Sequence, residues 1–444
     1  MKRNMRAGLA LVLAGSLFAA CGSDDDDDTL ATDAPAETDA PAETDAPAET
    51  DAPAETDAPA ETDAPAETDA PAETDAPAEP TGEPIVLYSV VPLSGGTDLS
   101  AVRVGGEVAA AAVNAAGGIN GRPLEFVACD NKNSPSDSDA CGREAVEAGA
   151  TALVMSQDAF GGGITQASPA GIPSIANCIC SAGDATDPLS FPTATGTVGQ
   201  AAQGVMAGAL GAETVAAVLF DGAGGDVIAS NVELGLTPYG LKVDIPVKIP
   251  LTAGDLSPYI AQMSEADAII LISSPPIVLN LIRGLDQAGY DGILISSAAS
   301  APLDGIQELG GAADGMYIQA GAPPSTAEGL PGIDQFNAEY DQYGEDSVAR
   351  TGYAVETWAN VHMLAEVMKG METVDSASLV EELASIGKVS YAGIELGDFS
   401  EPVAEWLPIR NFATEFYAWK AEGGNVSAIG DGPYDILDPP DSFD

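Results

Sequence analysis

Residues 113–135 read VNAAGGINGRPLEFVACDNKNSP, and they contain a boundary between a helix and a strand. The alanine-rich run before them ends at Gly117-Gly118. Glycine often ends a helix, because it adopts the left-handed conformation without a Cβ clash. A turn follows, and the apolar run after Pro123 has the composition of a strand. The stretch therefore predicts a helix with a glycine C-cap, a tight turn and a strand.

The same alternation of strand and helix continues on both sides of this stretch. In the first half the predicted strands are 85–91, 124–128, 152–155 and 172–176, with helices at 102–116 and 137–148. In the second half the predicted strands are 215–220, 242–249, 268–272 and 292–295, with helices at 227–236, 256–263 and 278–288. Strands separated by helical crossovers predict parallel, doubly wound sheets. The length from residue 84 onward suits two α/β lobes better than one core.

The first 20 residues have the order of an export signal. Lys2, Arg3 and Arg6 are followed by an apolar stretch and by small residues, and this stretch is too short for a stable membrane span. The ending Leu17-Phe18-Ala19-Ala20-Cys21 is similar to a bacterial lipobox. That similarity implies a diacylglyceryl group on Cys21, which would hold the chain at the outer face of the cytoplasmic membrane. The alternative is a plain secretory signal with an unmodified Cys21.

Residues 21–83 are predicted to be a disordered linker. The hexapeptide TDAPAE occurs eight times between residues 32 and 79, without an aromatic or branched apolar side chain. Such a composition cannot bury enough surface to offset chain entropy, and its prolines and charges keep it extended. A coil of this length spans roughly 45 Å. The final residues, 431–444, are rich in Asp and Pro and predict an unstructured tail.

The chain is strongly acidic, with a formal net charge of −54. Of its 69 acidic residues, 21 precede Pro80, and three of its 15 basic residues lie in the signal. The remainder therefore carries 48 acids and 12 bases, a net charge of −36. A surface of this charge repels nucleic acid, so we expect no nucleic-acid partner.

Four cysteines follow the signal, and an exported chain permits disulfides. Cys129 and Cys141 are the favoured pair, because they join a strand end to the next helix. Cys178 and Cys180 could pair with each other only through a strained turn, so free thiols and a bond between them are both open. A cysteine-only zinc site has little support, because no Cys-x-x-Cys spacing is present.

Several motifs occur in a fixed order along the chain: VPLSG at 91–95, TQAS at 165–168, GIPSIANC at 171–178, LIRGLDQAGYDG at 281–292, GGAADGMY at 310–317, TGYAVETWANVHMLAEVM at 351–368 and FATEFYAWKAEGG at 412–424. Together with 113–135, this order resembles the leucine/isoleucine/valine-binding family of type I periplasmic solute-binding proteins, which serve ABC importers. The resemblance implies two Rossmann-like lobes joined by three crossovers. The lobes would comprise 84–195 with 322–395, and 196–321 with 396–430.

The resemblance also implies a function. The lobes would close over a small polar solute, as a monomer without a cofactor, and deliver it to an ABC permease. The alternative is a sensor module that presents a solute to a membrane receptor or kinase. In doubly wound sheets the ligand lies beyond the carboxyl ends of the strands. The predicted ligand-binding residues are Ser94, Ser156, Gln157, Asp158, Phe160, Asn177, Cys178, Cys180, Asp221, Ser274, Ser297 and Ala298.

Cys180 and Ala298 are among the positions whose residue types differ from those that the family commonly has there. Cys180 stands where relatives commonly have a hydroxyl that holds the ligand carboxylate, and Ala298 stands where relatives have the acid that holds the ammonium group. A buried ammonium group without a carboxylate is costly. Asp158, Asp221 and Asp226 are the candidates to replace that acid. The missing acid predicts a solute other than a standard branched-chain amino acid, such as an amide, a urea-like compound or a modified amino acid.

The sequence gives less support to an enzyme than to a solute-binding protein. The single histidine, His362, lies at helical spacing, and no Gly-x-Ser-x-Gly elbow is present. One histidine is too few for a histidine-based metal site. We therefore expect neither catalysis nor a bound metal.

Overall fold

The computed structural model describes residues 79–94, 98–176, 178–193, 199–221, 223–250, 252–400, 414–430 and 432–443. The predicted signal peptide, Cys21, the linker repeats and Asn177 lie outside the described residues. All described residues belong to one compact unit. Within these ranges, no helix combines the length and apolar character that a membrane span requires.

Five parallel strands form the first sheet, in the order β2-β1-β3-β4-β5. They are β1 (Ile85–Val91), β2 (Leu124–Asp130), β3 (Ala152–Val154), β4 (Ser174–Ile175) and β5 (Ser190–Phe191). The associated helices are α2 (Ser100–Ala115), α3 (Pro135–Glu147), α4 (Gly162–Ala167), α5 (Ala182–Thr186), α11 (Pro331–Tyr343), α12 (Gly352–Lys369) and α13 (Ser376–Ile386). Strands β11 (Lys388–Tyr391) and β12 (Ile394–Asp398) form a separate hairpin. We call this sheet, its helices and the hairpin the first lobe.

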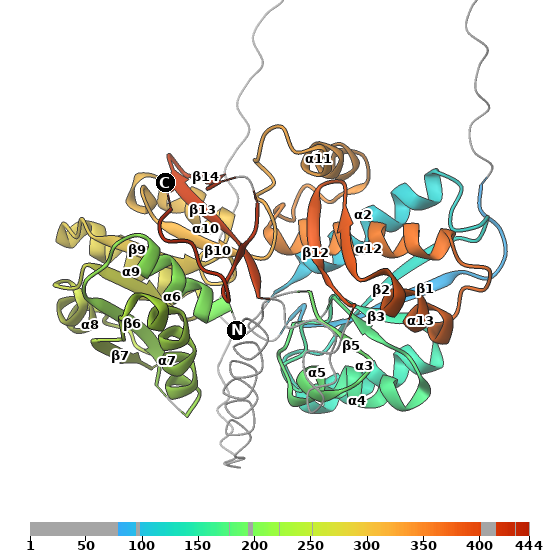
Figure 1. The fold of residues 1–444 in the computed structure, drawn as a ribbon, viewed down its shortest axis with the longest axis horizontal. Coiled ribbons are helices and arrows are strands. Elements are labelled where there is room, and N and C mark those ends of the chain that lie inside the picture. The colour runs from blue at the N-terminus through green and yellow to red at the C-terminus, as the bar shows by residue number, and fades with distance from the viewer. Residues whose placement is uncertain are drawn as a thin grey trace, which may run out of the picture. The chain divides into compact units, whose positions relative to one another are not determined.

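Both faces of the first sheet are covered, as the sequence of β1 requires. Ile85 and Leu87 pack into one apolar cluster with α2, α11 and α12, while Val86 and Tyr88 pack into another with α3. Figure 1 shows α2 and α12 lying along each other. Their close approach needs Gly105, because a Cβ there would lie 2.5 Å from the carbonyl oxygen of Ala354. A strand buried on both faces is the pattern of a doubly wound sheet.

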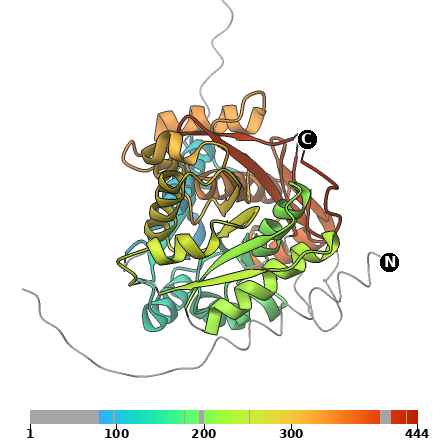
Figure 2. The ribbon, with the colours of Figure 1, turned by 90° about the vertical axis from the view of Figure 1, so that its left-hand side faces the viewer.

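The second sheet has the order β14-β13-β10-β9-β8-β6-β7, with β15 paired to β13. Strands β6 to β10 are parallel to one another. Strand β13 pairs antiparallel with β10 on one side and with β14 on the other. Their bounds are Val215–Phe220 (β6), Ile245–Ile249 (β7), Ala268–Leu271 (β8), Ile293–Ser297 (β9), Tyr317–Ala320 (β10), Glu415–Glu422 (β13), Asn425–Ala428 (β14) and Tyr434–Asp435 (β15). The helices are α6 (Gly199–Ala209), α7 (Ala223–Leu236), α8 (Ser257–Met263), α9 (Pro275–Ala288) and α10 (Leu303–Leu309). Figure 2 shows the green and yellow helices of this second lobe from outside.

Apolar clusters cover both faces of the second sheet as well. Val215 and Leu219 of β6 pack on one side with α6 and α7, while Ala216 and Val218 pack on the other with α9. The predicted class of two doubly wound α/β lobes is confirmed, and the predicted strands recur with shifts of a few residues at their ends.

The chain passes between the lobes three times. The passages follow β5, β10 and β12, and the first and third include residues outside the described ranges. The second passage is described and runs through Gly321 and Ala322, the latter packed in the first lobe. The predicted lobe boundary at 395/396 falls inside β12, whose Leu396 also packs in the first lobe. The exact lobe boundaries remain a prediction.

The prediction of an unstructured tail from 431 onward was wrong for the described residues 432–443. Tyr434 and Asp435 form β15 against Phe416 and Glu415. Ile436 is buried in the second lobe, and the ring of Tyr434 contacts that of Phe443. Three apolar side chains among the aspartates and prolines are enough to fix the segment by packing on β13.

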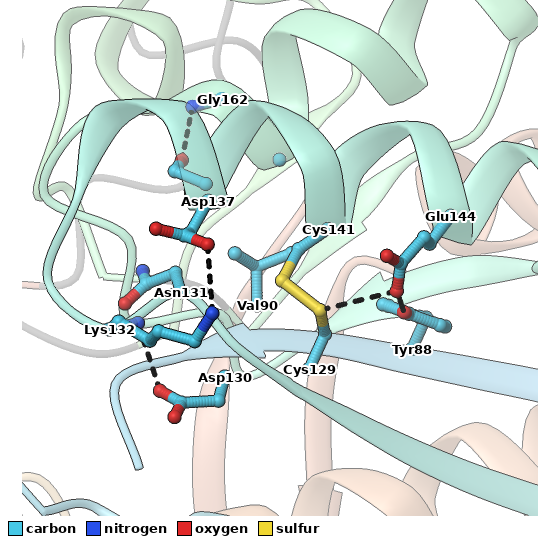
Figure 3. The surroundings of a disulfide bond; sticks show 12 residues. Tyr88, Val90, Cys129, Asp130, Asn131, Lys132, Asp137, Cys141, Glu144 and Gly162 are labelled. Carbon is cyan, nitrogen blue, oxygen red and sulfur yellow. Dashed lines mark hydrogen bonds and ion pairs between the residues drawn. A yellow bond between two sulfur atoms is a disulfide. The ribbon is translucent and has the colours of Figure 1, made fainter. Parts of the chain in front are cut away.

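The predicted disulfide between Cys129 and Cys141 is present. It joins the end of β2 to α3, with a Cα–Cα distance of 5.7 Å. Figure 3 shows Tyr88 and Glu144 beside it, where the Tyr88 hydroxyl donates to Oε2 of Glu144 at 3.4 Å. Burial and the neighbouring carboxylate raise the pKa of Tyr88 to about 12, so this hydroxyl stays protonated and can donate at neutral pH.

Candidate functional site

A cavity of about 240 Å³ is lined by residues of both lobes. The first lobe supplies the loops after β3 and β4 and the first turns of α12. The second lobe supplies the ends of β8, β9 and β10 and the start of α6. The lining residues are Gln157, Cys178, Gly199, Gln200, Gln203, Ile272, Ser297, Ala298, Ala299, Ser300, Gln319, Ala320, Gly321, Gly352, Tyr353 and Glu356. The position beyond the strand ends is where doubly wound folds bind their ligands.

Four of the predicted binding residues line this cavity. Gln157 and Cys178 reach it from the first lobe, and Ser297 and Ala298 reach it from the second. The backbone N–H of Ala298 donates to the carbonyl of Gln319 at 2.8 Å, which holds the loop after β9 against β10. Ala298 carries no charge, so the cavity lacks an acid at the position where the family resemblance placed one.

Three predicted residues of the first lobe are engaged in other contacts and are not among the described lining residues. The Ser94 hydroxyl donates to Asp130 at 2.5 Å. The buried Ser156 hydroxyl accepts the N–H of Val90 at 3.2 Å. Asp158, only 4% exposed, accepts hydrogen bonds that hold its own loop.

The other predicted residues also lie apart from the lining. Phe160 is exposed, and so is Asp221. Ser274 is the N-cap residue of α9. Asp226, which had been considered as a replacement acid, pairs with Lys248 at 2.7 Å. None of the three aspartates considered for the ammonium group therefore lines the cavity.

The sequence left the pairing state of Cys178 and Cys180 open. The two sulfurs are bonded to each other, and the Cα–Cα distance is 5.2 Å. The chain at Ile179 curls enough to bring the two Cα atoms into the normal range for a disulfide. Cys178 lines the cavity in its bonded form, so it offers the site no thiol donor.

The cavity has an acid that the sequence analysis missed. Glu356 lies in the second turn of α12 and is 8% exposed. Gly321 lies against it, and a Cβ on Gly321 would be 2.1 Å from Oε1 of Glu356. Burial raises the pKa of Glu356 to about 7, and a backbone hydrogen bond from Gly321 opposes this rise. Glu356 stands among apolar residues in the first half of α12, but its spacing alone does not distinguish it from a residue of the core.

Glutamine side chains provide most of the remaining polarity. Gln157, Gln200, Gln203 and Gln319 line the cavity. The Nε2 atom of Gln157 and the Oε1 atom of Gln203 are buried without a hydrogen-bond partner. Buried amide groups are normally paired, so these two atoms mark unmet hydrogen-bonding capacity at the site.

The single histidine is not part of the cavity. The Nε2 atom of His362 lies 2.8 Å from Oε2 of Glu339 in the first lobe. The imidazole ring of His362 stacks on the ring of Tyr391. Hydrogen bonds from His362, Gln335 and Trp358 lower the pKa of Glu339, although burial acts in the opposite direction. The pair belongs to the core between α11, α12 and the hairpin.

Comparisons with known proteins agree with this architecture. The chain is similar to the structure of an extracellular ligand-binding receptor from Verminephrobacter eiseniae (TM-score 0.63, 20% identity, 77% of this chain and 99% of that one). It is also similar to a leucine-binding protein from Thermotoga maritima (TM-score 0.59, 17% identity, 78% and 98%). A third similar structure is a solute-binding protein of an ABC transporter from R. palustris in complex with benzoate (TM-score 0.60, 18% identity, 81% and 97%). A search of curated proteins finds no match.

A family model described as periplasmic binding protein matches residues 89–402. That range is most of the chain and covers parts of both lobes, and the similar structures share the type I fold of leucine/isoleucine/valine-binding proteins. The family assignment implies an extracytoplasmic location. The chain thus belongs to the periplasmic binding protein family, as its motif order had indicated.

Proposed function

We propose that this protein captures a small polar solute between its lobes and delivers it to an ABC permease. The solute class comprises amino acids, amides and urea-like compounds, with the standard branched-chain amino acids disfavoured. A lipid on Cys21 holds the monomer at the outer face of the cytoplasmic membrane, and the acidic linker keeps the lobes away from it.

The observation that carries this proposal is that one cavity is lined by side chains from both lobes. A solute that bonds to both sides binds the closed arrangement better than an open one. Binding then shifts the equilibrium between open and closed forms by the difference in affinity. Gly321 belongs both to the lining and to a passage between the lobes, so solute contact and lobe position are linked there.

The lining favours binding over catalysis. Its described residues provide amides, hydroxyls, a disulfide sulfur and one carboxylate, and the similar proteins are named as binding proteins or receptors. We propose that this chain is not an enzyme and that it uses no cofactor.

A ligand screen with a blocked variant tests the proposal. Thermal-shift assays with amino acids, amides, amines and small organic acids identify a solute, because a ligand that binds only the native state raises the melting temperature. X-ray scattering with that solute is expected to show a smaller radius of gyration. Ala298→Trp is expected to fill the cavity and abolish both effects, whereas Ala377→Trp, at an exposed position of α13, is expected to keep them.

The outcome that contradicts lobe closure is an unchanged radius of gyration at a saturating solute concentration. Equal binding by the Ala298→Trp variant would place the solute elsewhere on the molecule.

A further inference from the structure

The charge of the cavity restricts the solute further. Glu356 is the only charged side chain among the described residues that line it, and the ion pairs of the described residues do not involve Glu356. We infer that the solute is a small organic cation, a protonated amine or amidine without a free carboxylate, whose positive group binds Glu356. This inference rests on the proposed capture of a small polar solute and assigns that solute a positive charge, in place of the amino acids and neutral amides named above.

Glu356 is placed as a partner for a cation. A buried carboxylate is costly unless a positive group or hydrogen-bond donors compensate its charge. Here the carboxylate contacts Gly321 at the passage between the lobes and is only 8% exposed. A solute cation would supply the missing charge in a place where water is scarce. A charge-assisted hydrogen bond in such a place is stronger than a neutral one.

Hydrogen-bond donors of the loop after β3, next to the lining residue Gln157, are already used by the protein. Backbone N–H groups of Phe160 and Gly163 donate to Asp158 at 3.2 and 2.9 Å. The hydroxyl of Ser138 also donates to Asp158, at 2.7 Å. The side chain of Asp158 thus takes these donors, so they are not available to an anionic group on the solute.

The remaining lining suits the uncharged part of such a solute. Ala298, Ala299 and Ile272 offer apolar contacts, and the glutamines offer acceptors as well as donors. Tyr353 adds an aromatic ring beside Glu356, and a ring of this kind attracts cations. A cavity of about 150 Å³ can hold benzene, so this larger one admits a ring with a small head group.

The net negative charge of the whole chain also favours a cationic solute. A net charge of −54 raises the local concentration of cations and lowers that of anions near the protein. The net charge does not select a particular solute. It favours cations, as the carboxylate of Glu356 does.

Two sets of isosteric probes separate charge from shape. Acetamidine, acetamide and acetate share one shape, and benzamidine, benzamide and benzoate share another, with charges of about +1, 0 and −1 at pH 8. Each probe, together with leucine, is titrated by calorimetry into the wild-type protein, Glu356→Gln and Glu366→Gln. Glu366 is the matched control, because it lies on the same helix and is exposed.

The expected result is that at least one amidine binds wild type tenfold or more tightly than its neutral and anionic isosteres. Glu356→Gln should lose at least tenfold in affinity for that amidine, and Glu366→Gln should bind it like wild type. If an amide, an acid or leucine binds as tightly as the amidines, or if Glu356→Gln keeps full amidine affinity, the inference is overturned and the proposed solute-binding function stands. If no probe and no member of the wider screen binds, both are overturned.

Discussion

At the scale of single residues, the buried carboxylate of Glu356 has a cost in the solute-free protein. Its pKa is raised from an ordinary value of 4.5 to about 7, mainly by burial. The folded protein therefore binds this proton more tightly than the unfolded chain does. Between these two pKa values, stability falls as the pH rises, because folding then requires a charge to be buried. Above pH 7 the full cost is present.

We predict that Glu356→Gln stabilises the solute-free protein at pH 8 by roughly 2–3 kcal/mol and leaves it nearly unchanged at pH 4.5. Glutamine has the same shape and carries no charge at either pH, so it avoids the cost that the ionised carboxylate has only at high pH. Urea unfolding of both proteins at the two pH values measures the difference.

The tyrosines near Glu356 do not contribute to the predicted difference in stability between the two pH values. Burial raises the pKa values of Tyr353 and Tyr417, so both remain neutral throughout the range. Glu366→Gln controls for the loss of a carboxylate from α12. A Glu356→Gln variant no more stable than wild type at pH 8 would contradict a raised pKa at this position.

The residues of the site were predictable where they follow strands. Gln157, Cys178, Ser297 and Ala298 come directly after apolar runs, and strand ends are where such folds bind ligands. Glu356 follows no strand. It lies in a helix whose other residues are mostly apolar, and the spacing alone reads as core packing. Only the packing of α12 against Gly321 reveals that this side chain reaches the cavity.

At the scale of secondary-structure elements, the Cys129–Cys141 disulfide fixes α3 to the first sheet. The bond closes a loop with a sequence separation of 12, and it lies beside Val90 and Tyr88 of β1 (Figure 3). Ser134 caps the start of α3 by accepting from the N–H of Asp137. The helix is thus held at its first turn by a cap and in its middle by a covalent bond.

We predict that replacing both Cys129 and Cys141 by alanine lowers the free energy of unfolding by about 3 kcal/mol, because the unfolded chain regains the entropy of a loop of this length. Urea unfolding of the wild type and the double variant measures this loss. The Cys178→Ala/Cys180→Ala variant, whose bond spans a separation of only 2, is the control and should lose less stability. An equal loss in both variants would contradict the loop-entropy explanation.

The alternation of elements was predictable because it depends on local patterns. Apolar runs such as 85–91 and 215–220 can be buried only inside a sheet that helices cover on both faces. The tail was not predictable in this way. Its short strand β15 exists because Tyr434 and Ile436 pack on β13, and that contact depends on tertiary structure. The Cys178–Cys180 bond likewise depends on how one loop curls.

At the scale of the whole molecule, two sheets with apolar clusters on both faces are linked by three passages of the chain. Each lobe has its own doubly wound sheet. This division explains why the side chains that line the cavity are distributed over both lobes: neither lobe alone encloses the cavity.

The acidic character of the chain is also a property of the whole molecule. Excess charge of one sign destabilises a compact state through self-repulsion, and salt screens that repulsion. The part of the chain after the linker keeps an excess of acids over bases in the ratio 48 to 12. Described ion pairs such as Arg283–Glu308 and Lys248–Asp226 are exposed and offset little of it.

We therefore predict that the melting temperature at pH 7.5 rises by several degrees when NaCl is raised from 0.05 to 1 M, because screening relieves repulsion among the acidic residues. The same series at pH 4.5, close to the isoelectric point of about 4.1, is the control, since few charges remain uncompensated there. Differential scanning calorimetry measures both series. A melting temperature that falls with salt at pH 7.5, or that rises equally at both pH values, would contradict a net cost of the acidic surface. Ion pairs or general salt effects would then govern the stability of this protein instead.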